Sequence, residues 1–171
     1  MKRIENRILT GIRKTSNTKE YHRFIIDNSD DNLVLKFDED HNDVSFPEEQ
    51  MDNIVLPMQY IPDFIGLITK AFFCNDYNEG YYEKFIDDIR LFSSVYIDER
   101  GFIITELRFG VEYAESDEGD FASLQWPNLM FPLKDLSKRI MPPSLAWLLD
   151  TLKNYYNEWQ KNHPEHPPMS D

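Results

Sequence analysis

Hydrophobic and polar residues alternate in several short runs of this chain. Residues 21–26 and 33–37 are rich in strand-forming types, and the stretch between them contains only Asp, Asn and Ser, which favour turns. In the second run Leu33, Leu35 and Phe37 alternate with Val34 and Lys36, so one face is directed at a core. The pattern predicts a β-hairpin.

A second hairpin is predicted around residues 98–101, between strands at 95–97 and 102–113. In the longer strand Leu107 and Phe109 share an apolar face and are expected to be buried, whereas Glu106, Arg108 and Glu112 share the polar face. A further strand is predicted at residues 121–126, closed by Pro127.

Other segments place apolar residues three or four positions apart, which is the spacing of an amphipathic helix. Ile4, Ile8 and Ile12 recur in this way, and Pro62 suits the first turn of a helix because its missing N–H costs nothing there. The helices predicted on this basis cover residues 4–12, 62–72, 82–92 and 142–161.

These elements predict one α+β domain over residues 1–161: a hairpin-rich antiparallel sheet of about four to six strands, packed against three or four helices. The expected order is α-β-β-α-α-β-β-(β)-α. A chain of 171 residues that is 41% hydrophobic is large enough for one core. Residues 162–171 include three prolines and are expected to form a disordered tail.

The net charge of -13 and a pI near 4.7 limit the kinds of partner that the chain is expected to bind. Residues 1–23 carry a net charge of +5, so the remainder of the chain carries -18. Such a field repels phosphate backbones and anionic lipids, which argues against direct nucleic-acid binding and favours a basic protein partner. The alternative is that the charge serves solubility alone.

The single cysteine, Cys74, cannot form an internal disulfide, and no N-terminal run resembles a signal peptide. The longest apolar runs are far shorter than the ~20 residues that span a bilayer. We therefore expect a cytoplasmic protein without a membrane-spanning segment.

Candidate catalytic and metal-binding motifs are incomplete. Asp38 begins a calcium-loop pattern that ends at Glu49, but Asp43 stands where the loop requires glycine. The four histidines do not have the spacing of a metal site, and no nucleotide-binding or nucleophile motif is present. We expect no cofactor, no metal site and no catalytic residue. Cys74 is expected to act as a small hydrophobic residue.

An acidic segment beside two aromatic residues is the best candidate for a partner-binding surface, because exposed carboxylates steer a basic partner and aromatic rings anchor it. The residues assigned to this surface are Glu112, Glu115, Asp117, Glu118, Asp120, Phe121 and Trp126.

Size, acidity and the missing motifs are typical of immunity proteins and antitoxins that neutralise a basic toxin or nuclease domain. We therefore hypothesise a non-enzymatic acidic binding protein. Two alternatives remain at this point: a regulatory or phage-type protein that mimics the charge of DNA, and a small hydrolase that uses carboxylates such as Glu106 and Glu112 with Arg108.

Overall fold

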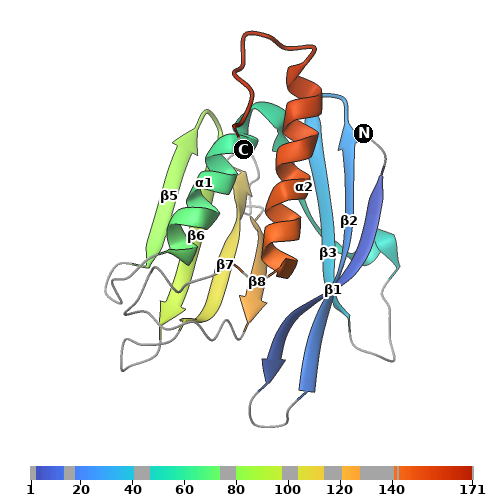
Figure 1. The fold of residues 1–171 in the computed structure, drawn as a ribbon, viewed down its shortest axis with the longest axis vertical. Coiled ribbons are helices and arrows are strands. Elements are labelled where there is room, and N and C mark those ends of the chain that lie inside the picture. Colours follow the sequence, from blue (N-terminus) through green and yellow to red (C-terminus); the bar gives the residue numbers. More distant parts are fainter. Residues whose placement is uncertain are drawn as a thin grey trace.

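In the part of the chain that it describes, the computed structural model contains two antiparallel sheets, two α-helices and two short 3-10 helices. It describes residues 3–13, 18–40, 47–73, 80–97, 104–113, 121–127, 141 and 143–170. The first sheet has the order β1-β2-β3-β4 and the second the order β5-β6-β7-β8. Figure 1 shows the two sheets side by side, with both helices in front of them.

The elements of the first half are β1 (Ile4–Arg13), β2 (Thr18–Ser29), β3 (Asn32–Asp40), η1 (Glu48–Gln50), β4 (Asp52–Pro57), η2 (Met58–Tyr60) and α1 (Ile61–Phe72). Those of the second half are β5 (Tyr81–Ile86), β6 (Ile89–Ile97), β7 (Ile104–Tyr113), β8 (Phe121–Pro127) and α2 (Pro143–Gln160). The α+β class and the antiparallel pairing agree with the sequence prediction. The described part of the chain has more strands and fewer α-helices than expected.

The first predicted hairpin is confirmed as β2 and β3. Phe24 pairs with Phe37 and Ile26 with Leu35, and all four side chains are buried. The core-facing side of this sheet therefore consists of alternate residues, as the strand period requires.

The segment at residues 4–12 is not a helix but strand β1, which pairs with β2. A spacing of four residues fits one turn of a helix, but it also keeps side chains on one face of a strand because four is an even number. Ile4 and Ile8 are accordingly packed against the core from β1.

The predicted helix at residues 82–92 is also wrong, because the chain there forms the hairpin of β5 and β6. A turn at Asp87 and Asp88 separates the strands, so the apolar residues on either side have a spacing that imitates a helix. Phe85, one of the apolar residues of the segment predicted as a helix, is 70% exposed on β5.

The pairing of β6 with β7 and the strand β8 confirm the later strands, while the predicted turn at residues 98–101 and the first two residues of the strand after it lie outside the described residues. Leu107, Phe109 and Val111 are fully buried, so the predicted register is correct.

Helix α1 packs on the second sheet and α2 against α1 and β1. Pro62 lies in the first turn of α1 as predicted, and the buried stripe includes Phe64, Ile68 and Phe72. The rings of Phe64 and Phe109 pack edge to face with their centroids 5.9 Å apart, and this contact joins α1 to β7. In the described part of the chain one buried cluster contains residues of both sheets and both helices.

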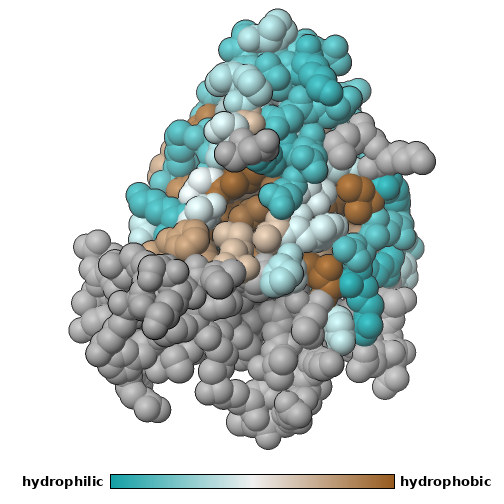
Figure 2. Space-filling model, in the orientation of Figure 1, coloured by the Kyte–Doolittle hydropathy of each residue, from teal (hydrophilic) through white to brown (hydrophobic). Residues whose placement is uncertain are grey.

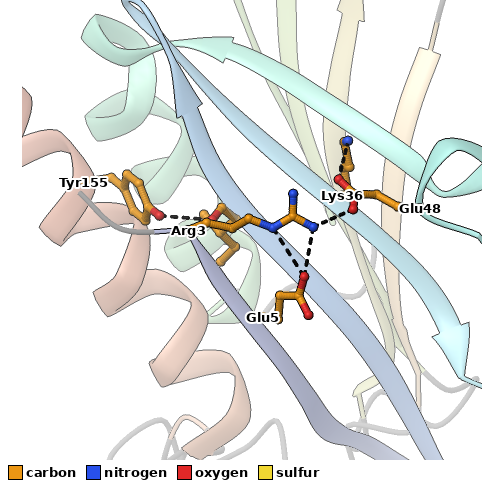
Figure 3. Close-up of polar contacts among 6 residues, drawn as sticks. Arg3, Glu5, Lys36, Glu48 and Tyr155 are labelled. Carbon is orange, nitrogen blue, oxygen red and sulfur yellow. Dashed lines mark hydrogen bonds and ion pairs between the residues drawn. The ribbon is translucent and has the colours of Figure 1, made fainter.

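Three polar contacts join α2 to β2, and join the residue before β1 to η1 and η1 to β3 (Figure 3). The Tyr155 hydroxyl donates to the carbonyl oxygen of Ile26 on β2 at 3.0 Å. Arg3, just before β1, is 2.5 Å from the Glu48 carboxylate, which also lies 2.9 Å from Lys36 on β3. These contacts link segments that are distant in sequence.

Residues 162–170, expected to be a disordered tail, instead return along the end of α2. The Tyr156 hydroxyl donates to the carbonyl of Pro167 at 2.6 Å, and the Met169 amide donates to the Asn157 side chain at 2.9 Å. These bonds give the proline-rich segment a fixed path that its composition did not indicate.

Among the described helices, none combines the length and the apolar character that crossing a membrane requires.

Candidate functional site

Of the seven residues assigned to partner binding, only Glu112 has a described side chain. Its carboxylate accepts a hydrogen bond of 2.9 Å from Nε of Arg90 on β6. Glu115, Asp117, Glu118 and Asp120 lie outside the described residues, and Phe121 and Trp126 belong to β8, opposite Glu112 and Leu107 in the ladder. The acidic segment at residues 114–120 joins the end of β7 to the start of β8.

Two turns of the sequence Asp-Asp, at residues 30–31 and 87–88, close the β2–β3 and β5–β6 hairpins. Asp30 has φ 53° and Asp87 has φ 52°, a left-handed conformation that Asp and Asn tolerate better than most residues. Their carboxylates are exposed at the ends of rigid hairpins.

Both turns bond to η2, which lies between them. The Met58 amide donates to the Asp31 carbonyl at 2.8 Å, and the Tyr60 hydroxyl donates to the Asp87 carboxylate. We call this part of the molecule, made by the two turns, η2 and the end of α2, the acidic end. It lies at the top of Figure 1, and Figure 2 shows that hydrophilic side chains dominate the top of the surface.

One cleft of the acidic end, which we call the Asp31 cleft, lies between the first turn and the end of α2 and has a volume of about 470 Å³. Met58 and Tyr155 are buried and form apolar parts of its lining, while Asp30, Asp31 and Glu158 are exposed. Its remaining lining residues are Asn28, Trp159, Asn162 and His163.

The Asp31 carboxylate is oriented by two aromatic rings. Nε1 of Trp159 donates to Oδ1 of Asp31 at 2.9 Å, and Nε2 of His163 lies 3.5 Å from the same oxygen. The His163 ring stacks on Trp159 with centroids 4.0 Å apart, and its Nδ1 is 2.9 Å from the Trp159 carbonyl. The returning tail therefore builds one wall of this cleft.

A second cleft, the Asp87 cleft, has a volume of about 280 Å³ and lies on the other side of η2. The hydrogen bond to Asp87, followed by burial, raises the pKa of Tyr60, so its hydroxyl remains a donor at neutral pH. The cleft is lined by Pro57, Tyr60, Asp87, Asp88, Ile89 and Tyr113.

The two clefts carry five carboxylates and, among the described residues, no Lys or Arg lines either of them. Glu158 pairs with Lys161 at 3.2 Å in a position exposed to solvent, and Asp31 lies 3.5 Å from Nε2 of His163. Apolar surface beside carboxylates suits the aliphatic stem and charged head of Lys or Arg. Within the described residues, no group of three or more His, Cys, Asp or Glu could hold a metal ion.

The sequence analysis placed the first Asp pair in a turn and the second within the helix predicted at residues 82–92. The indication it missed was that Asp-Asp occurs twice between strand-forming runs. Tyr113, the last residue of β7, lines the Asp87 cleft, and the acidic segment that the sequence analysis favoured follows it outside the described residues.

No protein-family model matches the chain, and no curated protein sequence matches it. Among solved structures, the Trypanosoma MRP1/MRP2 structure has a TM-score of 0.39, with 10% identity over 88% of this chain and 84% of the other. A guide-RNA-binding protein complex bound to a guide RNA has a TM-score of 0.40, with 10% identity over 88% and 90% of the two chains. These scores support no argument, and the chain is assigned to no family.

Proposed function

We propose that this protein is a non-enzymatic acidic binding protein that captures and neutralises a basic protein partner through its acidic end. The observation that carries the proposal is the pair of clefts flanking η2, with five carboxylates and no described Lys or Arg in their lining. The proposal includes a cytoplasmic location, as expected for a chain with one cysteine.

The negative charge attracts a basic partner, and the fixed turns determine where its cationic side chains bind. The net charge of -13 raises the rate of encounter with a positive surface, and the effect falls as salt screens it. The first turn is held by the backbone bond from Met58 to Asp31 and the second by the bond from the Tyr60 hydroxyl to the Asp87 carboxylate, so little ordering is required when a cation binds.

Immunity proteins and antitoxins are the class that this proposal implies, with a toxin or nuclease domain as the partner. A protein that mimics DNA charge would share the acidity but bind several unrelated DNA-binding proteins. The hydrolase alternative is less favoured, because the Glu112 carboxylate is already bound by the Arg90 guanidinium.

The test compares two charge-matched double variants. Asp30→Asn with Asp87→Asn removes one carboxylate from each cleft while keeping a residue that tolerates positive φ. Glu49→Gln with Asp52→Asn removes two exposed carboxylates near the far end of β4. An oligo-arginine peptide, titrated by calorimetry at low and physiological ionic strength, should bind the first variant ~2- to 30-fold more weakly than the wild type.

The control variant should bind like the wild type at physiological ionic strength. An equal loss in both variants would mean that the peptide responds only to net charge and would contradict the proposal. With the tagged protein as bait, recovery of several unrelated DNA-binding proteins in place of one basic partner would favour the charge-mimic alternative.

A further inference from the structure

Strand β5 is an edge strand of the second sheet, with β6 as its hydrogen-bonded neighbour (Figure 1). Its side chains include the two most exposed large hydrophobic residues among those described, Phe85 at 70% and Tyr81 at 52%. An edge strand presents N–H and C=O groups that can pair with another chain.

The pairing register shows which backbone groups face outward. The Val95 amide donates to the Gly80 carbonyl at 2.7 Å, so Gly80 directs its backbone groups towards β6. Alternate residues of a strand direct these groups to opposite sides, and no register shift interrupts β5. The outward N–H and C=O groups therefore belong to Tyr81, Glu83 and Phe85.

At the β4 edge of the first sheet, by contrast, a side chain of the second sheet bonds to the backbone groups of the edge strand. The Tyr113 hydroxyl accepts a hydrogen bond of 2.8 Å from the Val55 amide and donates to the Val55 carbonyl. At the other edge β1 contacts α2 and β8. Covering an edge in this way blocks pairing with another chain. Among the described elements, β5 is contacted mainly by β6 beside it and by α1 on the core-facing side.

The outer face next to this edge has a net negative charge. Tyr81 donates to Glu83 at 2.9 Å, and the Arg90 guanidinium lies 3.3 Å from Glu83 while also binding Glu112. Two carboxylates share one guanidinium, so this group of four residues keeps a charge of -1. Another cation, Arg108, lies farther from the edge. It is on β7, two strands from β5, and pairs with Ser94 of β6, which in turn pairs with Tyr81.

The one cation of β5 is directed to the other face. Nζ of Lys84 is 2.6 Å from the Asp63 carboxylate at the start of α1. The outer face of the edge therefore offers an aromatic ring, a carboxylate and an aromatic ring at successive alternate positions: Tyr81, Glu83 and Phe85.

We propose that β5 receives an extended segment of the basic partner by β-strand addition, which adds a strand to the second sheet. In such pairing the main chain supplies affinity and alternate side chains supply specificity. The side chains opposite Tyr81, Glu83 and Phe85 are apolar, basic and apolar, so the segment has the pattern apolar-x-Lys/Arg-x-apolar. The basic position rests on the proposed function, whereas the strand pairing does not.

The experiment uses the full chain and the peptide Thr-Tyr-Thr-Lys-Thr-Val-Thr, with amide hydrogen exchange followed by NMR. At a peptide concentration of ~10 times its Kd, exchange should slow ~10-fold at the amides of Tyr81, Glu83 and Phe85. The amides of Tyr82 and Lys84, already paired with β6, should change much less. A peptide with alternate N-methylated amides has the same side chains and should not protect them.

Phe85→Thr should weaken binding ~2- to 5-fold, as expected for one cross-strand pair. The control Val55→Thr changes an exposed apolar residue at the β4 edge and should bind normally. A peptide with Gln in place of Lys should bind more weakly to the wild type, and this difference should disappear in Glu83→Gln.

Absence of protection at the three amides, or equal binding of the N-methylated peptide, would overturn the proposal. So would a free protein that sediments as a dimer with these amides already protected, because a second copy would then occupy the edge. The Asp30→Asn, Asp87→Asn variant should still bind the strand peptide, so a failure of the acidic end as a binding site is distinguished from a failure of strand addition.

Discussion

At the scale of single residues, Glu48 shows how one carboxylate can join three segments of the chain. Arg3 before β1 and Lys36 on β3 both donate to it, at 2.5 and 2.9 Å, while Arg3 also reaches Glu5 (Figure 3). The hydrogen bonds from Arg3, then Lys36, lower the pKa of Glu48 to about 2. The charged form is therefore favoured in the folded state.

This shift makes a pH-dependent contribution to stability. The folded pKa lies below the unfolded value of 4.5, so the contribution is fully present above pH 4.5 and is lost as the pH falls towards 2. Wild type should exceed Glu48→Gln in free energy of unfolding at neutral pH, and the difference should shrink across that window. Urea titrations at several pH values measure it, with Glu49→Gln as the control. A difference that stays constant with pH would contradict the role given to Glu48.

Buried residues in strands were easier to predict than those on the last helix. Leu107 and Phe109 follow a strict alternation, and both are fully buried. Tyr155 on α2 is only 1% exposed although it has a polar hydroxyl, because that hydroxyl donates to the Ile26 carbonyl. A polar tip that finds a backbone partner allows a whole aromatic ring to be buried, and periodicity alone does not identify that partner.

At the scale of elements, the errors have a common physical origin. Spacings of three and four residues were interpreted as helix at residues 4–12 and 82–92, where the structure has β1 and the β5–β6 hairpin. In β1 a spacing of four keeps residues on one face of a strand, and in the β5–β6 hairpin the two-residue turn changes the phase of the alternation, so both segments imitate the helical spacing. The helix after Pro62 was predicted correctly since its stripe continues through several turns without an Asp-Asp pair.

The protected edge of β4 gives a prediction for Tyr113. Its hydroxyl bonds both backbone groups of Val55, and burial raises its pKa, so it remains protonated at neutral pH. Tyr113→Phe should lower the free energy of unfolding by ~1 kcal/mol, because both backbone groups lose their partner. Urea unfolding measures the change.

Tyr81→Phe is the matched control for Tyr113→Phe. The Tyr81 hydroxyl donates to the Glu83 carboxylate and accepts from the Arg90 guanidinium. Water can replace both partners at this exposed site, so the cost should be below ~0.5 kcal/mol. Equal costs for the two substitutions would show that the Tyr113 bonds do not stabilise the edge.

At the scale of the whole molecule, the acidic end is a product of topology. The Asp31 and Asp87 clefts combine two hairpin turns, η2 and the end of α2, which are far apart in sequence. The sequence analysis identified acidity and an acidic segment, both local properties. It could not place two separate Asp-Asp turns on either side of η2, because that depends on the packing of two sheets that had been predicted as one.

The same packing predicts that both sheets unfold together. Residues of both sheets, α1 and α2 belong to one buried cluster in the described part of the chain, and Phe64 on α1 contacts Phe109 on β7. Leu35→Ala in the first sheet and Leu107→Ala in the second each remove a fully buried side chain. Each should lower the free energy of unfolding by ~2–5 kcal/mol, through lost burial and the cavity that remains.

Because the core is shared, either substitution should shift one cooperative transition, with coincident midpoints by far-ultraviolet circular dichroism and by tryptophan fluorescence. Asn154→Ala, at an exposed position of α2, should change the free energy of unfolding by less than ~0.5 kcal/mol. If Leu107→Ala instead produced two separate transitions, with the first sheet keeping the stability of the wild type, the sheets would be independent units. The clefts on either side of η2 would then not be held in a fixed relation by a common core.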